Sequence, residues 1–361
     1  MPMPPLVVPV EALSDAERIR TARHRSLAHL GELGQRRLRA ARVAVMGAGG
    51  IGSPVILALA AAGVGTLIVI DDDVVDRTNL QRQMIHRQSD VGAPKVASAV
   101  RAASDLSPET RIVAVSERLD ASNADRLLQG ADLVIDGSDT FDTREAVAAS
   151  CERLGLPLVW GTVQEFDAQV TVFWSTPPAG FAPVVLGDLY PTGSAGELPT
   201  CADVGVLGAM TMQVGSLLAA EAIKLIAGIG EPLLGRVLVI DGLGARQREV
   251  PLRGAAVPAP AAPPPAVRHG ITAVGPSALG DTQVIDVREA HEVAAGMIPG
   301  ARHLPLAELL ANPGAIRGPV VIVCQTAVRS RRAAEALRAA GVEASILAGG
   351  MEAWTSATVA P

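Results

Sequence analysis

The stretch that decides the fold is residues 41–53, which read ARVAVMGAGGIGS. A short apolar run ends in a glycine-rich turn, and an Ala/Leu-rich helical segment follows. The order strand, glycine turn, helix presents backbone N–H groups and the positive end of a helix to a phosphate. Gly47 permits the tight turn, Gly49 lets the chain approach the phosphates, and Gly52 allows the helix to pack closely on the strand. Together with Gly50, these glycines form the predicted nucleotide-binding turn.

The composition is that of a globular α/β protein. Nearly half of the residues are apolar but only 2% are aromatic, so the cores are expected to consist of Ala, Val, Leu and Ile. At 361 residues, the chain has room for two or three domains with cores of their own. The net charge of −6 comes from interspersed acids and bases, which argues against a nucleic-acid partner. The longest near-apolar stretch, 55–70, is interrupted by glycines and is too short to span a membrane.

The cysteines and the N-terminus indicate the compartment. Cys151, Cys201 and Cys324 are too few and too scattered for a disulfide framework, and no CxxC pair that could hold zinc occurs. The N-terminal residues MPMPPLVVPVEAL include no basic region and no clear cleavage site, so no secretion signal is expected. These features predict a protein of the reducing cytoplasm.

Strand and helix patterns alternate through the first half of the chain. The capping-box pattern Ser14-Asp15-Ala16-Glu17 opens a predicted N-terminal helix that runs to about residue 29. The strands that follow are predicted at 43–46, 67–70, 111–115, 132–136 and 157–160, and the helices at 52–62, 93–104, 122–129 and 142–154. Such alternation is typical of crossover units and of a largely parallel sheet that is covered on both faces.

Beyond residue 163 the apolar pattern changes to a period of two, which predicts antiparallel strands that extend the sheet. The predicted segments are a strand at 169–174, a Pro/Gly-rich loop at 176–200, a helix at 204–227, a strand at 236–240 and an edge strand at 246–252. The first domain, residues 1–252, is therefore expected to have a Rossmann-like mixed sheet, with a parallel half extended by antiparallel strands.

A proline-rich stretch separates this domain from a second one. Residues 253–269 are predicted to be a semi-rigid linker, because prolines favour polyproline II and cannot fill a core. Residues 270–361 follow as a small α/β domain, with strands predicted at 283–286, 320–323 and 344–347 and a helix at 329–340.

Polar residues follow the ends of several predicted strands in the first domain. The segments 71–83, 91–95 and 135–139 lie at the carboxyl ends of parallel strands or just beyond, where open α/β sheets bind ligands. They bring an arginine, a lysine and acids together. Phosphoryl or nucleotidyl transfer uses such residues, because cations take up charge that develops on phosphorus and a carboxylate holds Mg²⁺. The pattern favours ATP over a nicotinamide cofactor, although the glycine turn and Asp71 alone fit both.

Several motifs then occur in one order: GQRRLRAARVAVMGAGGIGSP, NLQRQ, VGAPK, DLVIDGSD, LVWG, PTCADVGVLG and EAIKLIAGIGEPLLGRVLVID. Through them, residues 31–250 resemble the ubiquitin-activating superfamily in its bacterial branch, the adenylyltransferases of molybdopterin and thiamine biosynthesis. The resemblance implies ATP-dependent adenylation of the C-terminal Gly-Gly carboxylate of a small ubiquitin-fold sulfur-carrier protein. By motif position, Asp71 would bind the ribose, Asn79, Arg82 and Lys95 the phosphates, and Asp139 the Mg²⁺ that accompanies ATP.

Arg23 matches the family's arginine that reaches into the site of the partner subunit, which implies a homodimer. The family usually has Tyr and Ser or Asn before this arginine, where the chain has Thr21 and Ala22, and Asn after the metal-binding acid, where Thr140 stands. Many relatives also hold a structural zinc with two CxxC pairs. The matching segments here read GFAPVVLGDLYP and VPLRGAAVP and include no cysteine, so no zinc is expected.

A cysteine follows the second predicted strand of the second domain. Such a cysteine is usually a small buried apolar residue. A strand-to-helix loop, however, brings backbone N–H groups and the positive end of a helix to Cys324, which favours a thiolate and stabilises a persulfide anion. The motifs VIDVRE, GMIPGARHLPL and LAGGMEAW around it are similar to the rhodanese family. That family's active-site loop is a cysteine and five further residues, which would here be Cys324, Gln325, Thr326, Ala327, Val328 and Arg329.

Other residues of these motifs receive a structural interpretation. Asp286 and Arg288 are expected to be structural ties rather than catalysts. Ala327 stands where Gly is common, so a strained left-handed conformation is expected there. Cys201 precedes a predicted helix, and the family's corresponding cysteine exchanges acyl or sulfur groups in some members and is dispensable in others; both interpretations stay open. Cys151 lies in an apolar helix pattern and is predicted to be a core residue.

The combined hypothesis is adenylation of a carrier followed by attack of a Cys324 persulfide on the acyl-adenylate. Arg82, Lys95 and the second subunit's Arg23 would stabilise the first transition state, and Cys201 would resolve the acyl disulfide. Thiosulfate or a cysteine desulfurase would charge Cys324. Two alternatives stay open: an NAD-dependent oxidoreductase, or a non-catalytic carrier-binding scaffold that has lost activity.

Overall fold

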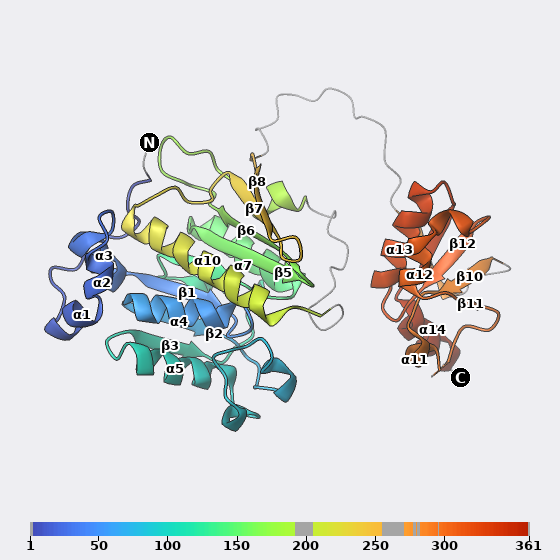
Figure 1. Ribbon diagram of the computed structural model, residues 1–361, viewed down its shortest axis with the longest axis horizontal. Coiled ribbons are helices and arrows are strands. Elements are labelled where there is room, and N and C mark those ends of the chain that lie inside the picture. The colour runs from blue at the N-terminus through green and yellow to red at the C-terminus, as the bar shows by residue number, and fades with distance from the viewer. Residues whose placement is uncertain are drawn as a thin grey trace. The chain divides into compact units, whose positions relative to one another are not determined.

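The computed structural model describes residues 3–191, 205–254, 271–276, 279, 282–294 and 296–359. It separates into two compact units, unit 1 (residues 1–258) and unit 2 (residues 259–361), which are coloured from blue to yellow and from orange to red in Figure 1. Cys201 and most of the predicted linker lie outside the described residues.

Unit 1 is built on one eight-stranded sheet in the order β3-β2-β1-β4-β5-β6-β7-β8 (Figure 1). The first five strands of this order are parallel, and the last three join antiparallel. The strands are β1 (Arg42–Met46), β2 (Thr66–Ile70), β3 (Arg111–Val115), β4 (Leu133–Asp136), β5 (Leu158–Gln164), β6 (Asp167–Phe173), β7 (Arg236–Asp241) and β8 (Arg246–Pro251). The predicted mixed sheet, in which a parallel part is extended by antiparallel strands, is confirmed.

Helices cover both faces of this sheet and create two apolar cores. On one face lie α3 (Gly31–Ala40), α4 (Gly52–Ala62), α5 (Lys95–Leu106) and α10 (Gly208–Ala227), and on the other lie α6 (Ala124–Leu128) and α7 (Phe141–Leu154). Leu38, Leu59 and Leu218 are fully buried in the first core, and Leu128 and Trp160 in the second. Since both faces are covered, the parallel strands are apolar on both sides, which explains their continuous apolar runs.

The longest helix is a core element. Among the described helices, α10 is the one long and apolar enough to cross a membrane by length and composition alone. More than half of its apolar window is buried inside unit 1. Val214, Leu218 and Leu225 on this helix are at most 1% exposed. The apolar character of α10 is therefore explained by packing against the sheet and its neighbouring helices.

The N-terminal region differs from the prediction. The capping box of Ser14 and Glu17 is present, but the predicted helix breaks into α1 (Asp15–Arg20) and α2 (Ala22–Arg25). Thr21 lies at the break, where its hydroxyl and its backbone N–H both donate to the carbonyl of Glu17. Such back-bonding by a threonine bends or ends a helix. Short helical turns also occur in loops: η1 (Arg77–Asn79), η2 (Gln88–Asp90) and α8 (Leu186–Leu189).

Unit 2 is a smaller, wholly parallel sheet in the order β11-β10-β12-β13-β9. Its strands are β9 (Ala273–Val274), β10 (Gln283–Asp286), β11 (Arg302–His303), β12 (Val320–Val323) and β13 (Ala344–Leu347), and its helices are α11 (Ala290–Val293), α12 (Leu306–Ala311), η4 (Pro313–Ala315), α13 (Val328–Ala339) and α14 (Gly350–Val359). One core lies under α12 and α13, and the other under α14. The three central strands match the prediction, whereas β9 and β11 are too short to show alternation.

Candidate active sites

A cavity of about 380 Å³ lies in unit 1 at the carboxyl ends of its parallel strands. In the sheet, β1 lies between β2 and β4. The chain adds β2 and β3 on one side of β1 and then returns to add β4 and β5 on the other side. This reversal is the position at which open α/β sheets bind ligands. The polar and glycine residues that line the cavity include Gly47, Gly49, Gly50, Asp71, Asp72, Asp73, Arg82, Gln83, Lys95, Arg118, Ser138, Asp139, Arg144 and Thr211.

The glycine turn takes the conformation that the sequence predicts. Gly47 has a φ of +82°, which residues with a side chain rarely adopt. A Cβ added at Gly52 would overlap the carbonyl oxygen of Gly47, so only glycine fits at the start of α4. Gly49 and Gly50 face the cavity with their backbone. The turn therefore leaves room for a ligand group at the end of β1.

Asp71 connects this turn to the end of β2. Its carboxylate accepts hydrogen bonds from the backbone N–H of Ala48 at 2.7 Å and of Asp73 at 2.9 Å. Burial raises the pKa of this carboxyl, and the positive charge of Lys95 opposes the shift. Asp71 also lines the cavity, as its predicted contact with a ribose requires.

Lys95 is held at the cavity wall by its position at the start of α5. Its side chain is only 8% exposed, and its Nζ lies 2.8 Å from Oδ2 of Asp73, whose side chain is 67% exposed. A cation at the positive end of a helix is unfavourable. A partly solvated carboxylate offsets this cost, and an incoming phosphate can take its place. The aliphatic part of the Lys95 side chain is therefore fixed, while its ammonium group stays available to a ligand.

Asn79 is the last residue of η1, and Arg82 lies in the turn that follows. Arg82 is half-buried and lines the cavity, and its guanidinium donates to the carbonyl of Thr78 at 3.3 Å. Asn79 is not among the lining residues; its side-chain oxygen accepts from the N–H of Asp76 at 3.1 Å, and its carbonyl accepts from the N–H of Arg82 at 3.0 Å. Asn79 thus builds the turn that carries Arg82, and its contact with a phosphate stays a prediction.

The turn after β4 carries Asp139 to the cavity. Asp136 is fully buried at the end of β4, and its Oδ1 accepts from the N–H of Ser138 at 2.8 Å. Burial raises the pKa of Asp136, and the nearby Arg144 opposes this. The guanidinium of Arg144 donates twice to the carbonyl of Ser138, at 3.0 and 2.8 Å. Asp139 itself is exposed at the cavity wall.

Arg144 is a site residue that the sequence reasoning missed. It is 7% exposed, donates to Oγ1 of Thr162 at 3.0 Å and lies 5.8 Å from the ring of Trp160. A signal for it exists in the sequence: Arg144, Val147 and Cys151 share one helical face, and the other two are buried core residues. An arginine on such a buried stripe indicates a specific polar partner.

Two further predicted residues fall elsewhere. Arg23 lies on α2, is exposed, and is not part of the cavity of its own chain. Cys151 is 2% exposed in the core, where burial raises the pKa of its thiol, so the predicted core role fits. Within the described ranges, the acidic and cysteine or histidine side chains that come together as a possible metal group are Asp71, Asp72 and Asp73.

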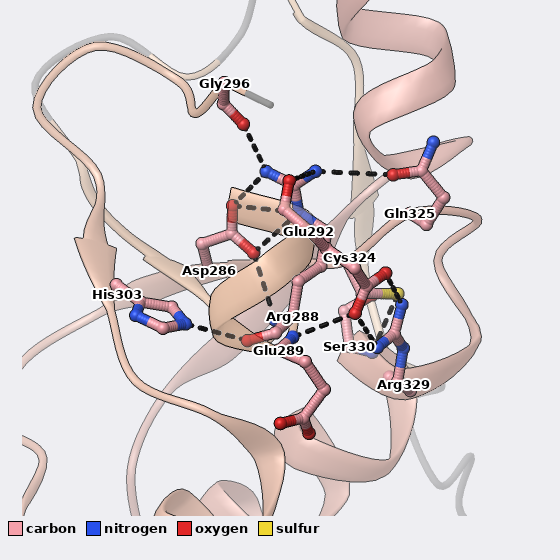
Figure 2. Close-up of polar contacts among 10 residues, drawn as sticks. All are labelled: Asp286, Arg288, Glu289, Glu292, Gly296, His303, Cys324, Gln325, Arg329 and Ser330. Atoms are coloured by element: carbon pink, nitrogen blue, oxygen red, sulfur yellow. Dashed lines mark hydrogen bonds and ion pairs between the residues drawn. The ribbon is translucent and has the colours of Figure 1, made fainter. Parts of the chain in front are cut away.

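In unit 2, the loop after β12 encloses a sulfur atom (Figure 2). Cys324 follows β12 and is fully buried, and its Sγ accepts from the backbone N–H of Ser330 at 3.4 Å, in the first turn of α13. The hydroxyl of Ser330 lies 3.7 Å from the same sulfur. Ala327 has a φ of +73°, so the expected left-handed conformation is present. The sulfur atom therefore lies at the N-terminus of α13, with a backbone N–H directed at it.

The predicted structural tie behind this loop is present. Arg288 and Asp286 form an ion pair of 2.8 Å, and both side chains are at most 4% exposed. Arg288 also donates to the carbonyl of Gly296 at 2.6 Å and to Oε1 of Gln325 at 3.3 Å. Figure 2 shows this arginine at the centre of the network. The buried charge is thereby paired and hydrogen-bonded, and it fixes the loop to β10.

A second ion pair at the loop was not predicted. Arg329 donates to both carboxylate oxygens of Glu292, on α11, at 2.6 Å each. These bonds lower the pKa of Glu292 to about 2. The sequence contains the glutamate three residues after Glu289, but the partner lies 37 positions away, so no local pattern could indicate the pair.

The comparison with known sequences gives the family. The chain matches the ThiF family over residues 21–258 and the rhodanese-like domain over residues 276–357. The chain belongs to the ThiF family. The ThiF match lies within unit 1, and the rhodanese-like match lies within unit 2.

This ThiF-family chain is 40% identical to the probable adenylyltransferase/sulfurtransferase MoeZ of Mycobacterium tuberculosis, over 98% of this chain and 96% of that protein. It is 42% identical to the sulfur carrier protein adenylyltransferase of Thermus thermophilus, over 63% of this chain and 84% of that protein. It is 32% identical to the adenylyltransferase and sulfurtransferase MOCS3-1 of Zea mays, over 93% of this chain and 81% of that protein.

The fold is also similar to that of solved structures. The crystal structure of E. coli MccB with MccA-N7isoASN has a TM-score of 0.58 and 21% identity, over 68% of this chain and 74% of that one. The ThiF-family chain is thus an adenylyltransferase and a sulfurtransferase, and adenylyl transfer in this family uses ATP. The prediction of adenylation followed by sulfur transfer is confirmed, and neither the nicotinamide alternative nor the non-catalytic alternative is supported.

Proposed function

We propose that unit 1 adenylates the C-terminal Gly-Gly carboxylate of a ubiquitin-fold sulfur-carrier protein and that Cys324 of unit 2 then supplies the sulfur. The observation that carries this proposal is Lys95, a buried ammonium at the wall of the cavity whose ion-pair partner is largely exposed. An exchangeable partner is what a phosphate-binding lysine requires. The Thermus thermophilus relative is named for a sulfur carrier, which supports the choice of substrate.

In the first step, a carboxylate oxygen of the carrier attacks the α-phosphorus of ATP. The bond between that phosphorus and the bridging oxygen breaks, and pyrophosphate leaves with the electron pair. Asp71 accepts from the ribose hydroxyls, the glycine turn approaches the phosphates, and Arg82 and Lys95 stabilise the charge that develops on the phosphoryl oxygens. Arg82 and Lys95 both line the cavity. The carbonyl of Asn79 accepts a hydrogen bond from the backbone N–H of Arg82 and so helps to position it.

Asp139 fits the role of a magnesium ligand. Its carboxylate is exposed at the cavity wall, on a turn fixed by Asp136 and Arg144. Asp72 and Asp73 also face the cavity. Carboxylates together with substrate phosphates are the usual ligands of Mg²⁺, and a bound ion would neutralise charge on the triphosphate. The chain's own contribution is to present Asp139 in the same cavity as the glycine turn.

In the second step, the terminal sulfur of a Cys324 persulfide attacks the acyl carbon, and AMP leaves. The product is an acyl disulfide between the carrier and Cys324. Attack of a second thiolate, for which we propose Cys201, on Sγ of Cys324 breaks the sulfur–sulfur bond. The carrier leaves as a thiocarboxylate, and the remaining disulfide is returned to two thiols by an external thiol reductant. Joining both activities in one chain raises the effective concentration of the sulfur donor.

Three further features belong to the proposal. We propose a cytoplasmic homodimer in which Arg23, exposed on α2, reaches the cavity of the partner subunit. We propose that no zinc is bound, because the segments around Pro183 and Gly254 contain no cysteine and pack on one another: a Cβ at Gly254 would clash with the carbonyl of Pro183. Cys324 receives its sulfur from thiosulfate or from a protein that carries a persulfide.

The test is ATP–pyrophosphate exchange with a carrier that ends in Gly-Gly. The exchange is expected to require the intact carrier C-terminus and Mg²⁺, and removal of the final glycine should abolish it. Cys324→Ala should leave the exchange unchanged and abolish thiocarboxylate formation, measured as a 16 Da mass increase of the carrier. As a matched control, Cys151→Ala should retain both. Loss of exchange in Cys324→Ala would contradict the proposed division between the units.

A further inference from the structure

Two arginines at the Cys324 loop are paired with carboxylates. Arg288 pairs with Asp286 inside unit 2, and Arg329 pairs with Glu292 at the edge of the loop. Arg329 is the last residue of this loop and directly precedes Ser330, whose backbone N–H donates to Sγ of Cys324 at 3.4 Å. These two arginines are therefore already neutralised by fixed carboxylates before a donor arrives.

Glu292 is held in place by three hydrogen bonds. Both of its carboxylate oxygens accept from Arg329 at 2.6 Å, and Oε2 also accepts from the backbone N–H of Glu289 at 2.9 Å. Both partners of the pair are less than a third exposed. Figure 2 shows the Glu292 carboxylate joined to Arg329 while the Glu289 side chain points away from the network. Because the pair is bidentate and tied to backbone, a competing anion must displace a fixed carboxylate.

The cavity beside the loop favours a different kind of donor. It measures about 520 Å³ and is lined by Met297, Met351 and Trp354 as well as by the polar side chains of Arg288, Glu292 and Gln325. Thioether and indole groups form contacts with organic side chains, not with a small hydrated dianion. A donor with a carbon framework would gain apolar contact there, whereas thiosulfate would gain none.

We propose that Glu292 determines the donor specificity of the Cys324 loop: by occupying Arg329 it disfavours thiosulfate and selects an organic persulfide carried by a cysteine thiol. The inference rests on the proposed sulfur transfer through Cys324 and narrows its donor. Glu292 acts through Arg329 and is a positioning residue, because it changes which anion this arginine can bind.

The two loading reactions differ in charge. With thiosulfate, the Cys324 thiolate attacks the sulfane sulfur, the sulfur–sulfur bond breaks, and sulfite leaves with the electron pair as a dianion. With an organic persulfide, the thiolate attacks the terminal sulfur, the sulfur–sulfur bond breaks, and the leaving thiolate carries a single negative charge on its sulfur atom. Both reactions give the same Cys324 persulfide and need no oxidant or reductant. A cation at the loop assists the first more than the second, because more negative charge is brought to the sulfur.

The experiment compares two probes, thiosulfate and glutathione persulfide, on the full-length chain, with cyanide as acceptor. The wild-type chain is expected to show a kcat/KM at least about tenfold higher for glutathione persulfide, equivalent to about 1.4 kcal/mol. Glu292→Gln should lower the KM for thiosulfate about tenfold and leave kcat and the KM for glutathione persulfide nearly unchanged. A change confined to one KM is not expected from general disruption of the loop.

The matched control is Glu289→Gln, which removes the same charge from the N-cap of this short helix and leaves the Arg329–Glu292 ion pair in place. It should leave both KM values unchanged. Equal effects of the two substitutions, an unchanged or higher thiosulfate KM in Glu292→Gln, or a wild-type preference for thiosulfate would each overturn the inference. The wild-type comparison keeps the test decisive even if Glu292→Gln does not fold. If neither probe loads Cys324, the proposed sulfur transfer fails; if both load it and thiosulfate is preferred, only the assignment of Glu292 fails.

Discussion

The glycine turn of unit 1 and the Cys324 loop of unit 2 have the same plan but opposite exposure. Each lies between a central parallel strand and the N-terminus of a helix, and each has a residue with positive φ: Gly47 at +82° and Ala327 at +73°. The first opens onto a cavity of about 380 Å³. The second closes around a cysteine with no exposed surface.

The charges of the two loops differ in the same way. The partner of Lys95 in unit 1 is a carboxylate with a 67% exposed side chain, whereas those of Arg288 and Arg329 in unit 2 are 0% and 22% exposed. An exposed partner can be displaced by a ligand, and a buried or bidentate partner is displaced at high cost. In unit 1 this strand–loop–helix plan presents a cation whose partner can exchange, and in unit 2 it surrounds a buried sulfur with arginines whose partners are fixed.

The largest expected effect comes from adding a Cβ atom at Gly52, in the glycine turn of unit 1. A Cβ in Gly52→Ala would overlap the carbonyl oxygen of Gly47, and backbone atoms cannot move aside as a side-chain end can. We expect unit 1 to lose about 3 kcal/mol or more of its free energy of unfolding. Calorimetry should show a lower melting temperature for unit 1 and an unchanged transition for unit 2.

The control for this substitution is Gly187→Ala. Gly187 lies in α8, has no heavy atom within 4 Å of an added Cβ, and does not have a positive φ. Its replacement should leave the melting of unit 1 within about 0.5 kcal/mol of the wild-type value. A similar loss of unfolding free energy in both variants would show that the close contact between Gly52 and the carbonyl of Gly47 is not its cause.

The next effect concerns the exchangeable cation of the first loop. Lys95→Met keeps the length and packing of the buried stem and removes the charge. We expect kcat/KM for ATP–pyrophosphate exchange to fall about 10²- to 10³-fold, because a preorganised cation is lost from the transition state. Arg87→Ala, which removes an exposed cation paired at 3.8 Å with Asp105 outside the cavity, should change the exchange less than about twofold. Equal losses in both would mean that overall charge, not Lys95, supports the reaction.

The sequence predicts the central parts of both loops because their local signals are strong. The strands at 111–115, 283–286 and 320–323 and the helix at 52–62 have the predicted bounds, since continuous apolar runs end at Gly or at polar residues. Unit 1's mixed sheet follows from the change of period after residue 163. These signals depend only on neighbouring residues.

The parts that were missed depend on residues distant in the chain. Glu292 and Arg329 are 37 positions apart, and Arg144 acts on Thr162 from a different element. The helix breaks at Thr21, whose hydroxyl donates to the carbonyl of Glu17. A threonine hydroxyl can either cap or bend a helix, and the side-chain rotamer decides between the two. Arg82, Lys95 and Asp139, which motif position assigns to one nucleotide site, line one cavity, and their roles there stay predictions. Motif position did not indicate which carboxylates neutralise the cations, and that pairing distinguishes the two loops.

The smallest expected effect concerns the positive φ that both loops contain, which Gly47 adopts in the first loop and Ala327 in the second. Ala327 adopts a left-handed conformation that costs a residue with a Cβ about 1–2 kcal/mol, whereas glycine adopts it freely. After allowance for the greater freedom of glycine in the unfolded chain, Ala327→Gly should stabilise unit 2 by about 0.5–1 kcal/mol. Ala336→Gly, in the middle of α13, should destabilise it by about as much. Urea unfolding of unit 2 would measure both. If Ala327→Gly also destabilises, the side chain of Ala327 must contribute packing to the loop that outweighs the backbone strain, and the second loop would then require its alanine as strictly as the first requires Gly47.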